Sequence, residues 1–127
     1  MSQQKRRILV VDDESDVGLS LKIILETYGF AVDCFTDPEA ALHTFNNDSY
    51  DLVILDIKMP KMSGFELYDK LKSADSTIKA LFLTALRELD EYDDFKRKVF
   101  PKLGERHFIQ KPVSNIRLLD QIDSIMN

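Results

Sequence analysis

Short runs of branched apolar residues alternate along this chain with stretches in which apolar residues recur every three or four positions. The runs are apolar without alternation, as in Ile8-Leu9-Val10-Val11, which is typical of strands buried on both faces. We expect strands at Arg7–Val11, Ala31–Phe35, Leu52–Asp56, Lys79–Thr84 and 106–110. Helical spacing predicts helices at 16–28, from 38 onward, from 64 to about 72, from 88 to about 100, and at 114–126.

Several helix boundaries are marked by their residue types. Gly29 follows the first predicted helix, where glycine commonly ends a helix. Asp37 is placed to cap the second helix with Pro38 in its first turn. Ser63 to Glu66 fits a capping box at the start of the third helix. The last helix has a broad apolar face, which either packs entirely in the core or forms part of a dimer contact.

The strict alternation of strands and helices predicts an α/β domain with a doubly wound parallel sheet. We expect five strands in the order 2-1-3-4-5, covered by helices on both faces. A length of 127 residues, without repeats or linkers, predicts one domain over 1–127 and no output domain.

Composition narrows the class of function. A net charge of -5 argues against a nucleic-acid surface, which needs concentrated basic side chains. No apolar run is long enough to span a membrane, and the first residues lack the apolar part of a signal peptide. The single cysteine, Cys34, fits a reducing compartment and a core position. We therefore expect a cytoplasmic protein.

Three carboxylates follow two of the predicted strands. Asp12 and Asp13 come after the first strand, and Asp56 ends the third. If these strands are neighbours, the three side chains converge at one sheet edge, where ligands bind in open α/β sheets. Like charges held this close resist ionisation, and a divalent cation such as Mg²⁺ would relieve that repulsion.

Two further strand ends add phosphate chemistry to this edge. Thr84 ends the fourth strand with a hydroxyl, and Lys111 follows the fifth with an ammonium group. Both groups can bind phosphoryl oxygens, and one carboxylate is left to attack phosphorus. The sequence therefore predicts a metal-dependent phosphoryl site.

Four motifs carry a resemblance to the receiver domains of two-component response regulators. They are Val11-Asp12-Asp13-Glu14, the segment from Leu55-Asp56 to Ser63-Gly64, Thr84-Ala85, and Lys111-Pro112, in family order and near family spacing. The resemblance covers nearly the whole chain and implies a flavodoxin-like (βα)5 fold. It implies that Asp56 is the phospho-acceptor, that Lys111 binds the phosphoryl group, and that Thr84 hydrogen-bonds it after transfer.

The resemblance also implies a metal set and a switch. Asp13, Asp56 and the backbone carbonyl of Lys58 would bind Mg²⁺ directly, and Asp12 would act through water. Phe108 falls at the switch aromatic and would turn inward when Thr84 moves toward the phosphoryl group. That movement would reshape the surface of the fourth helix, fifth strand and fifth helix. A cis peptide bond is expected at Lys111-Pro112.

The implied partners are a sensor histidine kinase or phosphotransfer protein and an unknown downstream protein. The chain would be a monomer or weak homodimer, with no contact to nucleic acid or membrane, and a phosphorylation-controlled switch instead of an enzyme. Two alternatives stay open: a receiver-like module that signals by binding alone, and the receiver half of a longer transcription regulator. A phosphohydrolase is disfavoured, because Lys58 stands where the usual second acid would be.

One segment departs from the family pattern. The stretch from Thr84 to Lys111 is several residues longer than in a typical receiver, and its helical periodicity runs through Pro101. Proline stops or kinks a helix. We therefore expect an elongated or broken fourth helix and a nonstandard loop into the fifth strand.

Overall fold

A five-stranded parallel sheet forms the centre of the molecule in a computed structural model, which describes residues 5–45, 49–85 and 104–127. The strands are β1 (Arg7–Val11), β2 (Ala31–Phe35), β3 (Leu52–Asp56), β4 (Lys79–Thr84) and β5 (Phe108–Gln110). Their spatial order is β2-β1-β3-β4-β5, with every neighbouring pair parallel. The predicted sheet, its order and the doubly wound flavodoxin-like fold are confirmed.

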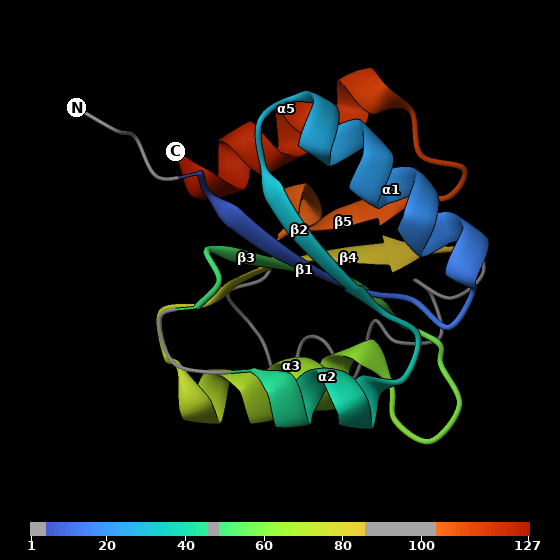
Figure 1. The fold of residues 1–127 in the computed structure, drawn as a ribbon, viewed down its shortest axis with the longest axis vertical. Coiled ribbons are helices and arrows are strands. Elements are labelled where there is room, and N and C mark those ends of the chain that lie inside the picture. The colour runs from blue at the N-terminus through green and yellow to red at the C-terminus, as the bar shows by residue number, and fades with distance from the viewer. Residues whose placement is uncertain (1–4, 46–48, 86–103) are drawn as a thin grey trace.

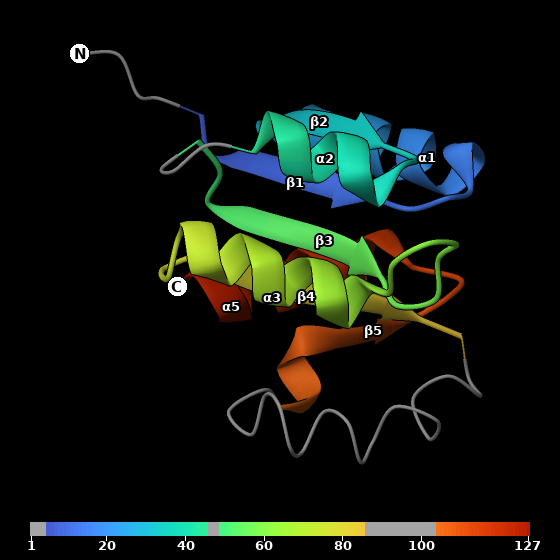
Figure 2. The same ribbon diagram turned by 90° about the horizontal axis from the view of Figure 1, so that it is seen from below.

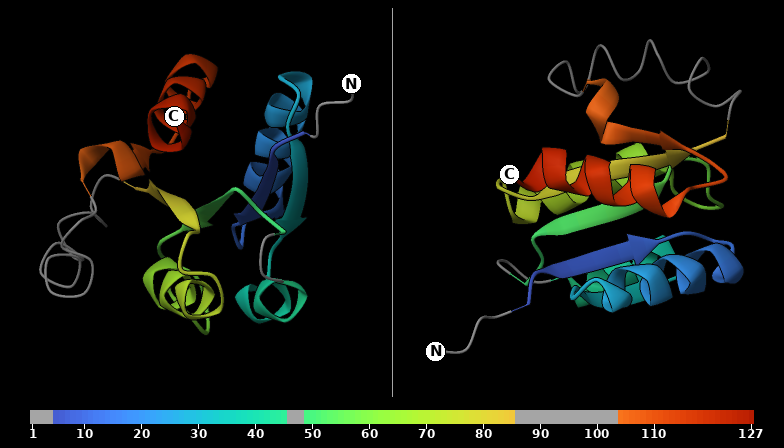
Figure 3. Two further views of the ribbon diagram at one scale, coloured as in Figure 1. Left: turned by 90° about the vertical axis from the view of Figure 1, so that its left-hand side faces the viewer. Right: turned by 90° about the horizontal axis from the view of Figure 1, so that it is seen from above.

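Helices cover both faces of the sheet (Figures 1 and 3). They are α1 (Ser15–Thr27), α2 (Pro38–Thr44), α3 (Gly64–Ala74) and α5 (Asn115–Met126). Helices α1 and α5 pack on one face, and α2 and α3 on the other. The predicted fourth helix lies outside the described residues. Within the described ranges, no helix has the length and apolar character needed to cross a membrane.

The predicted helix boundaries are largely confirmed. The Asp37 side chain accepts a hydrogen bond from the backbone N–H of Glu39 at 3.1 Å, and Ser63 accepts one from Glu66 at 3.1 Å. Gly29 follows α1 with a φ of +95°, a conformation that favours glycine. Asp37 and Ser63 thus mark the starts of α2 and α3, and Gly29 marks the end of α1.

Burial on both faces explains why the apolar runs become central strands. All five residues of β3 are buried, and so are four of the five in β1. Both strands lie inside the sheet, with β1 between β2 and β3 (Figure 2). Most of the apolar face of α5 packs into the core through Leu118, Ile122 and Ile125. Tyr28, the last residue of the predicted helix 16–28, is the C-cap of α1 and is 58% exposed, because the chain leaves the helix there.

The start of the fifth strand differs from the prediction. We expected a strand over 106–110, but a 3-10 turn (η1, Glu105–His107) precedes a shorter β5. The N–H of His107 donates to the carbonyl of Gly104 at 3.0 Å, and the N–H of Gly104 donates to Nδ1 of His107 at 3.0 Å. The ladder between β4 and β5 therefore starts at Phe108, which pairs with Phe82. The Lys111-Pro112 bond is cis, as expected.

Candidate functional site

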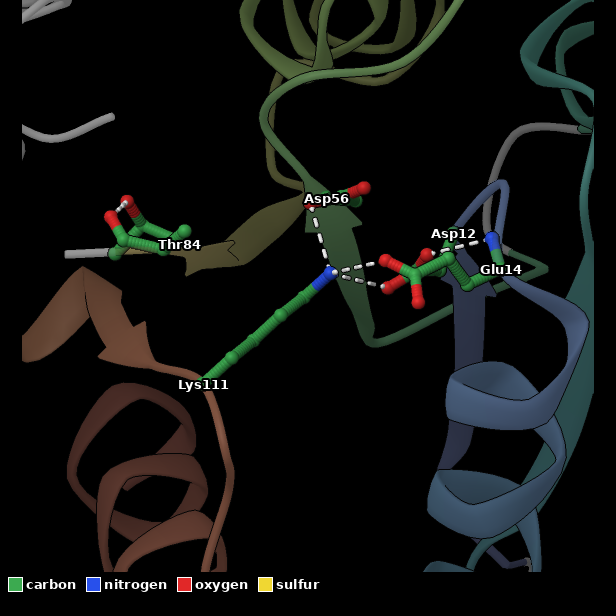
Figure 4. Close-up of polar contacts among 6 residues, drawn as sticks. Asp12, Glu14, Asp56, Thr84 and Lys111 are labelled. Carbon is green, nitrogen blue, oxygen red and sulfur yellow. Dashed lines mark hydrogen bonds and ion pairs between the residues drawn. The ribbon is translucent and has the colours of Figure 1, made fainter. Parts of the chain in front are cut away.

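The predicted site residues meet at the carboxyl edge of the sheet (Figure 4). Asp12 and Asp13 follow β1, Asp56 ends β3, Thr84 ends β4 and Lys111 follows β5. Because β1, β3, β4 and β5 are parallel and successive in the sheet, their ends lie side by side. The strand order therefore brings the predicted carboxylates, hydroxyl and ammonium group to one edge of the sheet.

The three carboxylates form a compact cluster. One oxygen from each of Asp12, Asp13 and Asp56 lies within 4.8 Å of the other two. Asp12 is 1% exposed and Asp56 3% exposed, whereas Asp13 is open to solvent. Two buried acids beside one accessible acid make a pocket of negative charge that a cation can enter from the Asp13 side.

Among the described residues, Lys111 brings a positive charge to this cluster and offsets part of its negative charge. Its Nζ lies 3.1 Å from Oδ2 of Asp12, 3.3 Å from Oδ1 of Asp56 and 3.7 Å from Oε1 of Glu14 (Figure 4). The N–H of Glu14 also donates to Oδ1 of Asp12 at 2.9 Å. Sequence reasoning assigns no role to Glu14, although it directly follows the acidic pair, and the structure places its carboxylate beside Lys111.

Burial and charge shift the proton affinities in this cluster. Burial, then the charge of Asp12, raises the pKa of Asp56 to about 7, against the opposing effect of Lys111. Burial also raises the pKa of Asp12 above its ordinary value. Burial alone would lower the pKa of Lys111, but Asp56 and Asp12 outweigh it and raise that pKa. The site is thus short of positive charge.

The donor set fits a hard divalent cation. Carboxylate oxygens are the ligands such ions prefer, and three converge here. Oδ2 of Asp12 is buried without a hydrogen bond from any described residue, and its nearby charge is Lys111. A divalent cation would add positive charge beside Asp12 and favour the ionised form of Asp56.

The loop after β3 positions Asp56 through a close backbone approach. The N–H of Gly64 donates to the carbonyl of Ile57 at 2.8 Å, and the N–H of Ile57 donates to Leu83 at 3.2 Å. A Cβ atom on Gly64 would overlap the carbonyl oxygen of Asp56 and lie 3.0 Å from its carbonyl carbon. The close approach of α3 to the end of β3 therefore requires a residue without a side chain at Gly64.

Thr84 and Phe108, the predicted switch pair, occupy different surroundings. The hydroxyl of Thr84 donates to the carbonyl of Ala85 at 2.9 Å (Figure 4). The Phe108 ring is buried, with ring centroids 5.4 Å from Phe82 and 6.2 Å from Phe65. The inward ring thus coexists with a Thr84 hydroxyl bonded to the backbone and a Lys111 paired with Asp56.

The doubly wound fold and the acidic edge together are those of an α/β domain with a cation site at the carboxyl ends of its strands. Residues 8–123 match the model of the response regulator receiver domain family. The chain belongs to that family, whose members are signalling switches and not classical enzymes.

Known relatives and solved structures agree with this assignment. The chain is 34% identical over 125 residues to the transcriptional regulatory protein RprY of Bacteroides fragilis, covering 97% of this chain and 50% of RprY. It is 39% identical over 85 residues to QseB of Haemophilus influenzae, covering 67% of this chain and 38% of QseB. The chain spans about half the length of such relatives or less.

The solved structures match over nearly the whole chain. A CheY-like receiver domain from Methanospirillum hungatei is 30% identical with a TM-score of 0.81, covering 95% of this chain and 93% of that one. A receiver domain from Clostridium thermocellum is 30% identical with a TM-score of 0.80, covering 94% of this chain and 92% of that one.

Proposed function

We propose that the chain accepts a phosphoryl group on Asp56 from a histidine kinase or a phosphotransfer protein, in a reaction that requires Mg²⁺. The observation that carries this proposal is the buried Asp56 carboxylate, 3.3 Å from Lys111 Nζ and within the three-acid cluster. Asp13, Asp56 and the backbone carbonyl of Lys58 would hold the metal, with Asp12 acting through water. Mg²⁺ would supply charge neutralisation for the phosphoryl oxygens.

The residues of the chain perform the remaining steps. A carboxylate oxygen of Asp56 forms a bond to phosphorus while the donor's phosphorus–nitrogen bond breaks. The electron pair stays on the donor histidine, so no proton has to come from Asp56. Lys111 leaves Asp56 for a phosphoryl oxygen, and the Thr84 hydroxyl turns from Ala85 to a second one. Transfer therefore depends on position and charge more than on acid–base chemistry.

The surface beside Lys111 supports a protein donor. A cavity of about 440 Å³ lies between α1 and the residues after β5, next to Lys111. Its apolar lining comes from Val17, Leu21, Ile24, Pro112 and Val113. A donor histidine must approach Asp56 across this edge, and an apolar rim suits a protein surface better than a small anion. Kinase donors draw on ATP, so we place the reaction in the cytoplasm.

The downstream partner belongs to the same proposal as the phosphoryl transfer. Relatives named as transcription regulators favour a downstream effector, either a separate protein or a further part of a longer chain. We propose a monomer or weak homodimer that signals through β5, α5 and their surroundings. A module that signals by binding alone is the competing function, and the complete acceptor set argues against it.

Incubation with Mg²⁺ and acetyl phosphate is expected to add one phosphoryl group to the wild-type protein, detected by intact mass. The Asp56→Asn variant should give no adduct. Asp16→Asn, which removes an exposed acid near the same edge, should be labelled like the wild type. An adduct that persists in Asp56→Asn would place the acceptor elsewhere. Repeated failure of a wild-type protein that binds Mg²⁺ would favour the binding-only module.

Binding of Mg²⁺ is expected to release a proton below neutral pH. With the pKa of Asp56 raised to about 7, the acid is mostly protonated at pH 6 and mostly ionised at pH 8. The affinity for Mg²⁺ should therefore rise roughly tenfold between these pH values. Calorimetric titration in buffers of different ionisation enthalpy measures the released proton. A similar release in Asp56→Asn would assign it to another group.

A further inference from the structure

One side chain of α5 donates hydrogen bonds to two backbone carbonyls around the start of the edge strand β5. Nε2 of Gln121 donates to the carbonyl of Phe108 at 2.6 Å and to that of Arg106 at 3.2 Å. These acceptors are two residues apart, so the two N–H groups of one amide act as a neighbouring strand would. We call these two hydrogen bonds the Gln121 bridge.

The bridge joins the two faces of the sheet at Phe108. The Phe108 ring packs with Phe82 and Phe65 in the core on the α2–α3 side. Helix α5, which carries Gln121, packs on the opposite face together with Ile109. The Phe108 ring is thus packed on the α2–α3 side of the sheet, and the Phe108 carbonyl is bonded to α5 on the other side. A shift of the backbone at Phe108 would therefore affect both contacts.

The position is specific for an amide. Oε1 of Gln121 is buried and receives no hydrogen bond from the described residues. Turning the amide over would place this oxygen against two carbonyls, which repel it. The unmet acceptor is tolerated because the two donated bonds require this orientation. A second contact, from Arg106 to the carbonyl of Ser124 at 3.3 Å, ties the same segments together.

We propose that Gln121 is a positioning residue that holds Phe108 inward and passes the effect of phosphorylation from β5 to α5. The ring is inward while Lys111 still pairs with Asp56 and Thr84 still bonds to Ala85. A change at β5 would then reach α5 through the two hydrogen bonds of the Gln121 bridge, while the Phe108 ring stays inward. This inference rests on the proposed phosphorylation of Asp56 and names the residue that transmits it.

The first test uses the wild-type protein and nuclear magnetic resonance. The two side-chain N–H protons of Gln121 should exchange slowly with solvent, because both are bonded. Mg²⁺ with beryllofluoride, a ligand named for a solved CheY complex, should shift both resonances. Contacts between the Phe108 and Phe82 rings should be present before and after this addition. Side-chain resonances that do not respond to bound beryllofluoride would overturn the proposal.

The second test removes the bridge while keeping the shape of the side chain. In Gln121→Met, amide exchange at Phe108 to Gln110 should become about tenfold faster without any ligand. The beryllofluoride-induced shifts along α5 should fall to roughly half or less. Asp120→Asn, at an exposed neighbouring position, should match the wild type in both measurements.

The outcomes separate this inference from the proposed function. A wild-type protein that binds no beryllofluoride and forms no phosphate adduct contradicts the proposed function, whereas unchanged exchange at Phe108 in Gln121→Met contradicts the bridge. Faster exchange with a full response of α5 would make Gln121 merely structural. If Gln121→Met does not fold, the wild-type side-chain resonances alone decide the question.

Discussion

Asp56→Asn is expected to raise the free energy of unfolding in the absence of divalent cations, by up to about 4 kcal/mol at pH 8. The acid has an ordinary pKa of 3.8, and burial beside Asp12 raises the pKa of Asp56 to about 7 in the fold. The ionised carboxylate is therefore less favourable inside the protein than in the unfolded chain. Asparagine has the same shape without the charge, so it removes that penalty.

The free energy of unfolding depends on pH because the pKa of Asp56 is higher in the fold than in the unfolded chain. Below pH 3.8 the carboxyl is protonated in both states, and the raised pKa of Asp56 has no effect on stability. Between about pH 4 and pH 7 the unfolded chain loses its proton first, so stability falls as pH rises. Above about pH 7 the penalty is complete. The advantage of Asp56→Asn should therefore grow from pH 4 to pH 7 and then level off.

Urea unfolding at pH 5 and pH 8, with a chelator present, measures this difference. Asp69→Asn, which removes an exposed acid from α3, is the control and should change stability little at either pH. Saturating Mg²⁺ should stabilise the wild type and leave the variant nearly unchanged. A variant less stable than the wild type at pH 8 would mean that the contact of Asp56 with Lys111 outweighs burial.

The bounds of the first four strands agree with the prediction, and those of β1, β3 and β4 follow from runs of buried apolar residues. A run such as Leu52 to Leu55 is apolar on both faces, so it becomes a central strand. The start of β5 could not be predicted in this way. The bond from the backbone of Gly104 to the His107 ring decides it, and strand propensity carries no information about that contact.

The chemistry of the site was predictable for a related reason. Asp12, Asp56, Thr84 and Lys111 all stand at strand ends, and parallel topology brings strand ends together. The contacts of Glu14 with Lys111 and of Gln121 with Phe108 could not be predicted, because each joins two different segments of the fold. Gln121 lies 13 positions from Phe108, and only the packing of α5 brings the two together.

Gly64→Ala is expected to be the most damaging of the glycine substitutions, lowering the free energy of unfolding by about 3 kcal/mol. The new Cβ would overlap the carbonyl oxygen of Asp56, which is backbone and cannot rotate away. The first turn of α3 would have to separate from the end of β3. Because that end carries Asp56, phosphate labelling by acetyl phosphate should slow along with the loss of stability.

Two other glycines provide matched controls for steric overlap. A Cβ on Gly104 meets no described atom within 4 Å, so Gly104→Ala should change stability by less than about 0.5 kcal/mol. Gly29 is equally open but has a φ of +95°, and Gly29→Ala should cost about 1 kcal/mol through backbone strain alone. Urea unfolding of the three variants gives the comparison. Equal effects would mean that the contact between α3 and Asp56 is looser than the structure has it, and that Asp56 is positioned by β3 alone.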